Sequence, residues 1–237
     1  MNSSRHVLAI DAGNTRVKGA VFDGDEIAHS FVVDTSTLTE ASYTDTLTNQ
    51  INQRINGAIL SSVVRGVDEI FRSVVKNTVE VDLHVTVPDS PIGILVGVPD
   101  PGNVGIDRLL TAGEAYHRTN QATIVVGCGT AVTVDVVSEG GVYQGGTISA
   151  GTGTSAWSLS ERTSLLPEVD PRLPIDAGLP KSTVSAIRTG VLLSTAGGID
   201  RLVAEVARRA DIVNPSVLLT GGDSRLLSCI LDTEHQV

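Results

Sequence analysis

Short apolar runs, each ended by small or polar residues, alternate along the chain with segments whose apolar positions recur at the helical period. The runs that predict strands are 7–10, 17–22, 57–64, 82–87, 124–126, 131–135 and 217–219. The segments that predict helices are 35–56, 67–76, 107–116, 151–165, 182–195 and 198–210. This mixture of strands and helices predicts an α/β protein.

Two of the predicted strand pairs are joined by the same kind of turn. The first turn is Asp11-Ala12-Gly13-Asn14-Thr15, and the second, half a chain length later, is Gly127-Cys128-Gly129-Thr130. A repeat at this distance predicts an internal duplication, which we divide into domains 1–115 and 116–237. A third glycine turn, Thr220-Gly221-Gly222-Asp223, follows the last predicted strand.

Glycine at the end of a strand lets backbone N–H groups approach a ligand closely, and phosphate is the usual ligand of such turns. Threonine adds a hydroxyl donor, and aspartate can hold a divalent cation through water. A single turn of this kind is more often an ordinary hairpin. The recurrence at the half-chain distance favours a nucleotide held by several turns.

Composition narrows the choice of partners. The 237 residues carry a net charge of −10 and few aromatic side chains (one Trp, three Tyr and three Phe), which argues against a general nucleic-acid binder. No apolar run is long enough for a membrane span, and the polar residues 1–6 lack the apolar core of a secretory signal. The two cysteines form no disulfide framework or zinc spacing, so a cytoplasmic protein is expected.

Eight short motifs occur in one order along nearly the whole chain. They are 11–15 (D-x-G-N-T), 61–64 (S-S-V-V), 101–108 (P-x-x-x-G-x-D-R), 129–135 (G-T-A-x-T-x-D), 145–148 (G-G-x-I), 163–167 (T-x-x-L-P), 183–190 (T-x-x-A-I-x-x-G) and 220–223 (T-G-G-D). Each motif alone is weak, but the ordered set resembles the type III pantothenate kinase family, in the superfamily of actin, sugar kinases and acetate kinase. The resemblance implies two duplicated ribonuclease-H-like (actin-like ATPase) domains with a nucleotide cleft between them.

The resemblance also implies roles for individual residues. It makes Asp107 the base for the acceptor hydroxyl and places Asp11 near Mg²⁺ and the phosphates. The remaining contacts are Gly13, Asn14, Thr15, Gly129 and Thr130 for phosphate, Gly221 and Gly222 for the base or ribose, and Gly105, Arg108 and Thr183 for the acceptor. Structural alternatives stay open: Asp107 capping a helix or pairing with Arg108, Thr183 capping a helix, and Arg108 as a solvated surface side chain.

The activity implied by the resemblance is ATP-dependent phosphorylation of pantothenate to 4'-phosphopantothenate, the first step of coenzyme A biosynthesis. The implied cofactors are Mg²⁺ and a monovalent cation, K⁺ or NH₄⁺. The implied assembly is a homodimer whose active site forms between two subunits.

The chain departs from the family pattern at several positions. Gly127 replaces the aspartate associated with the monovalent cation, and Val98 replaces a tyrosine that would contact pantothenate. Ala150 stands in place of a proline and Ser182 in place of an asparagine. The closing strand is hard to recognise after residue 231, so a shortened C-terminal end is expected. Two alternatives therefore remain, an actin-like-fold kinase for another small acid and a non-catalytic nucleotide-binding regulator.

Overall fold

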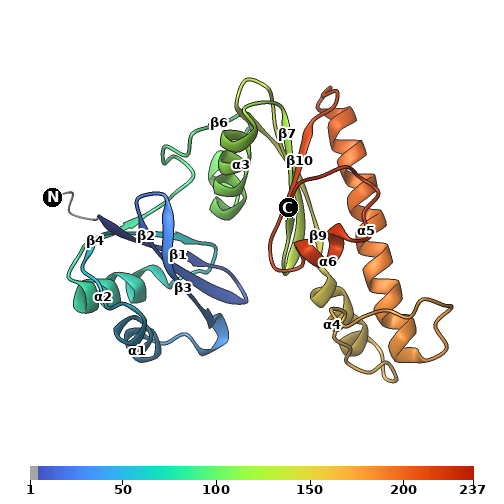
Figure 1. Ribbon diagram of the computed structural model, residues 1–237, viewed down its shortest axis with the longest axis horizontal. Coiled ribbons are helices and arrows are strands. Elements are labelled where there is room, and N and C mark those ends of the chain that lie inside the picture. Colours follow the sequence, from blue (N-terminus) through green and yellow to red (C-terminus); the bar gives the residue numbers. More distant parts are fainter. Residues whose placement is uncertain (1–4) are drawn as a thin grey trace. The chain divides into compact units, whose positions relative to one another are not determined.

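The computed structural model describes residues 5–237, which form two compact units (Figure 1). The first unit contains the described residues up to Ser90 together with Gly102–Asp107, and the second contains Pro91–Pro101 and Arg108–Val237. The domain boundary expected after residue 115 was drawn from the sequence repeat, whereas the two units are defined by contacts between residues. The expected boundary stays a prediction. The expectation of no secretory signal rests mainly on residues 1–4, which lie outside the described residues.

The first unit is a five-stranded sheet with two helices. Its elements are β1 (His6–Ala12), β2 (Arg16–Asp23), β3 (Glu26–Asp34), the 3₁₀ turn η1 (Thr35–Thr37), α1 (Glu40–Gln50), β4 (Ile55–Ser62), α2 (Asp68–Val79), β5 (Leu83–Val85) and the 3₁₀ turn η2 (Pro101–Asn103). The strand order is β3-β2-β1-β4-β5. Strands β1, β2 and β3 are antiparallel neighbours, whereas β4 runs parallel to β1.

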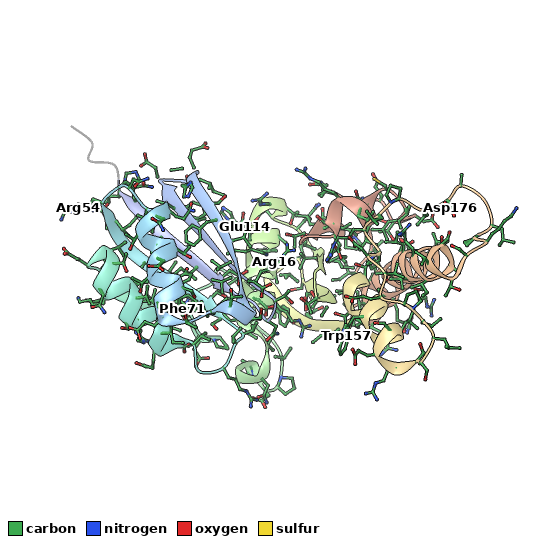
Figure 2. All side chains as sticks on the ribbon, turned by 90° about the horizontal axis from the view of Figure 1, so that it is seen from below. Arg16, Arg54, Phe71, Glu114, Trp157 and Asp176 are labelled. Atoms are coloured by element: carbon green, nitrogen blue, oxygen red, sulfur yellow. The ribbon has the colours of Figure 1, made fainter. Side chains whose placement is uncertain are left out.

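Alternation of side chains along β1 fixes which face of this sheet is buried. Leu8 and Ile10 are buried in one core with residues of α1 and α2, while the residues between them lie on the other face. Within the core, the ring of Phe71 (labelled in Figure 2) meets the ring of Tyr43 edge to face, with centroids 4.7 Å apart. This packing holds the β1–β2 turn on a rigid support.

The second unit is a five-stranded sheet with a long helix. Its elements are β6 (Leu95–Val96), α3 (Ile106–Thr119, whose first two residues belong to the first unit), β7 (Thr123–Cys128), β8 (Ala131–Val137), β9 (Val142–Ala150), α4 (Thr152–Arg162), α5 (Thr183–Arg209), β10 (Ser216–Thr220) and α6 (Ser224–Ser228). The strand order is β10-β7-β8-β9-β6. The core of this unit lies where α5 packs against β7, β8 and β10.

Strand order and direction repeat between the two units. In the second unit β7, β8 and β9 are antiparallel neighbours and β10 runs parallel to β7, as β4 does to β1. Helices enter at the same point of the repeat, between β3 and β4 in the first unit and between β9 and β10 in the second. The repeated topology, β1 to β4 matched by β7 to β10, confirms the predicted duplicated ribonuclease-H-like architecture.

Three expectations about elements were wrong or incomplete. The two helices predicted at 182–195 and 198–210 form one helix, α5, because Ala196 and Ile199 continue its buried face across Gly197 and Gly198. Strands β3 and β9 were not predicted, since β3 has mostly exposed residues and β9 contains paired glycines. Near the C-terminal end of the chain, Gln236 makes a parallel bridge to Leu218 in β10.

Within residues 5–237, no helix combines the length and the apolar character needed to cross a membrane.

Candidate active site

The first predicted phosphate turn joins β1 to β2. The Gly13 N–H donates to the Arg16 carbonyl at 3.0 Å, and a Cβ at Gly13 would lie 3.2 Å from the same oxygen. The hydroxyl of Thr35, the first residue of η1, donates to the Gly13 carbonyl at 2.7 Å and so connects the turn to η1. Asn14 and Thr15 are exposed at the tip, where their polar groups can meet a ligand.

Asp11 lies at the base of this turn, on the sheet face opposite α1 and α2. Burial raises the pKa of its carboxyl, the Lys18 ammonium 3.9 Å away lowers it, and the Asp107 carboxylate raises it again. The structure therefore brings Asp11 and Asp107 together within the first unit. Asp11 still exposes 47% of its side chain, so a cation can reach it.

Gly105 makes room for the Asp107 carboxylate. A Cβ on Gly105 would lie 2.5 Å from Oδ1 of Asp107, so any other residue would push this oxygen away. Asp107 occupies the first turn of α3, where the positive end of the helix dipole favours a carboxylate. The position of the Asp107 carboxylate therefore depends on glycine at residue 105.

The second predicted turn joins β7 to β8 and is one residue shorter than the first. The Gly129 N–H donates to the Ala131 carbonyl at 3.1 Å, and Gly129 and Thr130 are exposed at its tip. The Thr130 carbonyl accepts from the N–H of Gly151 at 3.0 Å and the hydroxyl of Thr154 at 2.6 Å. The start of α4 thus fixes the turn.

The third predicted turn packs directly on the second. Gly221 has φ +100°, and a Cβ there would lie 2.3 Å from the Cys128 carbonyl oxygen, so only glycine fits. The Asp223 N–H donates to the same carbonyl at 3.1 Å. Gly222 is exposed beside this contact and has open space around it. The structure therefore brings Gly129, Gly221 and Gly222 to one end of the second sheet.

Asp223 anchors this end of the sheet through two further contacts. Its side chain is buried and accepts from the Arg172 guanidinium at 2.7 Å and from the hydroxyl of Thr152 in the first turn of α4. Burial, together with the charge of Asp223, also raises the pKa of the Cys128 thiol to about 12. Cys128 therefore stays protonated and is no nucleophile.

Arg108 is not a solvated surface side chain. Its side chain is 15% exposed, and its guanidinium forms an ion pair with the buried Asp135 of β8, with Nη2 2.5 Å from Oδ1. The hydroxyl of buried Tyr143 donates to the same carboxylate at 2.7 Å. The sequence did not predict this arrangement, because residue 135 is a single acidic side chain within an apolar strand.

Thr183 is the first residue of α5, but it does not cap the helix. Ser182 is the cap, and its hydroxyl accepts from the Ser185 N–H at 3.2 Å. Thr183 is exposed and lines a hollow of about 510 Å³ together with Leu166 and Lys181. The capping alternative for Thr183 is therefore wrong.

The departures from the family pattern lie in well-defined surroundings. A Cβ at Gly127 would lie 2.7 Å from the Thr133 hydroxyl, which occupies the space of a larger side chain. Val98 lies near Gly145 of β9, with its Cγ1 3.6 Å from the position of a Cβ there. Ala150 is exposed and ends β9 opposite Ala131.

Two residues near Asp11 were missed by sequence reasoning. Lys18 places a cation beside the carboxylate, and Ser61 pairs with Asp11 across β1 and β4. Ser61 is buried, and its hydroxyl has no hydrogen-bond partner among the described residues. The sequence does not give the register in which β1 pairs with β2 and β4. That register places Lys18 and Ser61 beside Asp11.

Oxygen ligands of this kind suit Mg²⁺, which binds through one or two carboxylates, water and substrate phosphates. Over residues 5–237, no cluster of three or more His, Cys, Asp or Glu side chains is arranged around a metal position. A Mg²⁺ ion that arrives with a nucleotide fits Asp11. A monovalent cation held by a carboxylate at position 127 does not fit, because Gly127 has no ligand and Asp135 is paired with Arg108.

Comparison with known proteins gives one consistent result. The profile of the family described as type III pantothenate kinase matches residues 7–205. A type III pantothenate kinase from Desulfatibacillum aliphaticivorans is 30% identical over 98% of this chain and 92% of its own length. One from Syntrophus aciditrophicus (strain SB) is 33% identical over 93% of this chain and 89% of its own length.

Two solved structures share the fold at low sequence identity. One is a conserved protein from Campylobacter jejuni assigned to the Baf family of transcriptional activators (TM-score 0.58, 22% identity, 97% of this chain and 90% of that one). The other is the ethanolamine utilization protein EutJ from Carboxydothermus hydrogenoformans (TM-score 0.55, 15% identity, 98% of this chain and 84% of that one). At these identities the likeness concerns the fold alone.

Proposed function

Because the chain belongs to the type III pantothenate kinase family, we propose that it is a cytoplasmic enzyme that phosphorylates pantothenate with ATP to give 4'-phosphopantothenate, the first step of coenzyme A biosynthesis. One observation carries the assignment: the Asp107 carboxylate lies over Gly105 and close enough to Asp11 to raise its pKa. This proximity supports the assignment of Asp107 as the proton acceptor and of Asp11 as the carboxylate that would bind the metal ion.

In the proposed reaction, the primary hydroxyl oxygen of pantothenate attacks the γ-phosphorus of ATP. A new P–O bond forms, the bond to the bridging oxygen of the β-phosphate breaks, and ADP leaves. Asp107 accepts the hydroxyl proton. Phosphoryl transfer of this kind has a loose transition state, so little proton transfer is needed early and a carboxylate base suffices.

Charge and backbone donors support the nucleotide side of the proposal. Asp11 would hold Mg²⁺, whose charge neutralises the phosphates and offsets the repulsion between Asp11 and Asp107. The Lys18 ammonium adds a cation beside them. The phosphate contacts are assigned to Gly13, Asn14, Thr15, Gly129 and Thr130, and the base or ribose contacts to Gly221 and Gly222.

On the acceptor side, the guanidinium of Arg108 would bind the pantothenate carboxylate, with Gly105 beside it. Thr183 would contact pantothenate from the partner subunit of a homodimer. Large apolar side chains that are exposed on and around α4 and α5 support such a dimer. They include Trp157 (56% exposed, labelled in Figure 2), Leu165, Leu179, Val184 and Leu193.

A kinase for another small acid is the second candidate, and Val98 favours it. This position has an apolar side chain where the family has a tyrosine that contacts pantothenate. A panel of small hydroxy acids, tested with ATP and Mg²⁺ by coupled detection of ADP, separates the two candidates. Turnover of another acid together with none of pantothenate would reassign the acceptor.

The role of Asp107 is tested by Asp107→Ala. We expect turnover to fall by about 10²-fold or more while ATP binding, measured by calorimetry, is retained. Asp68→Ala is the matched control, because Asp68 is an acidic residue in the first turn of α2. Wild-type turnover in Asp107→Ala, or an equal loss in Asp68→Ala, would show that the carboxylate only supports a helix.

A further inference from the structure

Asp135 is a buried carboxylate in the middle of β8, with 1% of its surface exposed. Its Oδ1 accepts from Nε and Nη2 of Arg108, at 3.1 and 2.5 Å, and from the Tyr143 hydroxyl at 2.7 Å. Nε also lies 3.3 Å from Oδ2. The three side chains come from α3, β8 and β9, so this is a tertiary contact between three elements.

The backbone of β9 is adapted to this carboxylate. A Cβ at Gly146, directly opposite Asp135, would lie 2.7 Å from Oδ1 and 2.2 Å from the Val134 carbonyl oxygen. Glycine therefore stands in a strand interior, where it weakens the strand, to leave room for the Val134 carbonyl and the Asp135 carboxylate. This accounts for a glycine of the G-G-x-I motif that the phosphate turns do not use.

A contribution to the stability of the fold is a poor explanation for the cluster of Arg108, Asp135 and Tyr143. Burying an ion pair costs desolvation that the attraction between the charges roughly cancels, and apolar residues of similar volume often serve as well. What such a pair supplies is a fixed geometry. Two donors on one edge of the guanidinium bind one carboxylate, which fixes the plane of the group.

We propose that Asp135 and Tyr143 are positioning residues that hold the Arg108 guanidinium in the orientation in which it binds the carboxylate of the acceptor. The proposal rests on the proposed function, because it assumes an acidic acceptor. Asp135 accepts from Nε and Nη2, and these two contacts fix the plane in which the whole guanidinium lies. Asp107, the next residue along α3, is the proposed base for the hydroxyl of the same molecule.

Two substitutions test the proposal by kinetics. In Tyr143→Phe, which removes one hydrogen bond, we expect the KM for pantothenate to rise by about 3- to 10-fold, with kcat and the KM for ATP unchanged. In Asp135→Asn we expect a rise of about 10- to 100-fold, again confined to pantothenate. If Asp135→Asn fails to fold, the KM for pantothenate of Tyr143→Phe still tests the positioning role.

Each substitution has a matched control in the same unit. Tyr116→Phe removes a tyrosine hydroxyl that donates to the Glu139 carbonyl at 2.9 Å. Asp200→Asn alters a carboxylate that accepts from the N–H and hydroxyl of Thr233 at 2.9 and 2.7 Å. Both controls should leave the two KM values unchanged. Equal changes in the KM for ATP and for pantothenate, or no change in either, would overturn the positioning role.

A spectroscopic measurement separates failure of this proposal from failure of the proposed function. The Nε–H signal of Arg108 in a ¹⁵N–¹H spectrum, assigned by its loss in Arg108→Lys, should exchange slowly in the wild type and rapidly in Asp135→Asn. A rapidly exchanging wild-type signal overturns the positioning role. A slowly exchanging signal that pantothenate leaves unshifted, without turnover, supports the positioning role and overturns pantothenate as the acceptor.

Discussion

At the scale of single residues, several side chains near the turns have positions that favour ligand binding over stability. Asp11 has a raised pKa because it is partly buried and lies near Asp107, and Ser61 beside it has a buried hydroxyl without a partner among residues 5–237. Neither arrangement strengthens the folded state. The cation and phosphates of the proposed reaction would account for both arrangements.

Asp11→Asn should therefore stabilise the protein at neutral pH. A raised pKa in the folded state means that the folded protein binds the proton more tightly, so the free energy of unfolding falls as pH rises through this pKa. Removing the charge should raise that free energy by less than about 1 kcal/mol, because the side chain is half exposed.

Thermal unfolding without nucleotide, measured between pH 3 and 8, checks this prediction. The gain should appear above the pKa of the unfolded carboxyl and vanish below it. Asp82→Asn is the control with the opposite sign, since a hydrogen bond and the charge of Lys76 lower the pKa of Asp82. A less stable Asp11→Asn at pH 7 would contradict the account of Asp11.

Gly127 leads to a prediction about cation dependence. It has no carboxylate to bind a monovalent cation, and the nearby Asp135 is paired with Arg108. At constant ionic strength, turnover should therefore be equal within about a factor of two in K⁺, NH₄⁺ or choline salts. A strong requirement for K⁺ would show that other oxygen atoms bind the ion.

How far the sequence predicts the site depends on the distance between partners in the chain. Gly13, Gly129 and Gly221 were predicted correctly as strand-end turns, because each signal is local and follows an apolar run. The partners of Arg108 were not predicted. Asp135 lies 27 residues from it, and only the register of β8 and β9 brings both Asp135 and Tyr143 to the guanidinium.

At the scale of elements, the segment that joins α4 to α5 has no regular structure and is tied to the third glycine turn by an ion pair. Residues 163–182 join α4 to α5, and Arg172 within this segment donates to the buried Asp223 beside the third glycine turn. Arg188 of α5 adds hydrogen bonds to the carbonyls of Asp170 and Pro174. Arg172 thus couples the conformation of segment 163–182 to the conformation of the glycine turn at residues 220–223.

Arg172→Gln should loosen this connection. It leaves the Asp223 carboxylate buried without its cation, which should cost about 1–2 kcal/mol after allowing for the half-exposed guanidinium. We expect a lower melting temperature and faster proteolysis within 163–182. Arg201→Gln is the control, because the exposed Arg201 pairs weakly with Glu205 at 3.4 Å, and equal losses in both variants would contradict the link.

At the scale of the whole molecule, the duplication was the most predictable feature. Two similar turns half a chain apart predicted two similar sheets, and the strand order confirms them. Strands β3 and β9 and the single helix α5 were harder to predict. Strand β3 contacts mainly β2, β9 contacts mainly β8, and α5 contacts mainly α4 and β8, and the local sequence does not contain these long-range contacts.

Assembly supplies the last prediction, which tests whether Thr183 acts on the neighbouring subunit. Thr183 is exposed at the start of α5 and does not cap it, so its hydroxyl is available to a partner. If each site combines Asp107 of one subunit with Thr183 of the other, a mixed dimer of Asp107→Ala and Thr183→Ala contains one intact site. Random exchange of equal amounts should then restore about a quarter of wild-type activity at low pantothenate.

The measurement compares each variant alone with the mixture after subunit exchange, and sedimentation verifies that dimers are present. Mixing Asp107→Ala with the double variant Asp107→Ala/Thr183→Ala is the control, because no combination of these chains has an intact site. If the first mixture shows only the average of its two components, Thr183 serves its own subunit. In that case the exposed apolar side chains of α4 and α5 need another explanation than a shared active site.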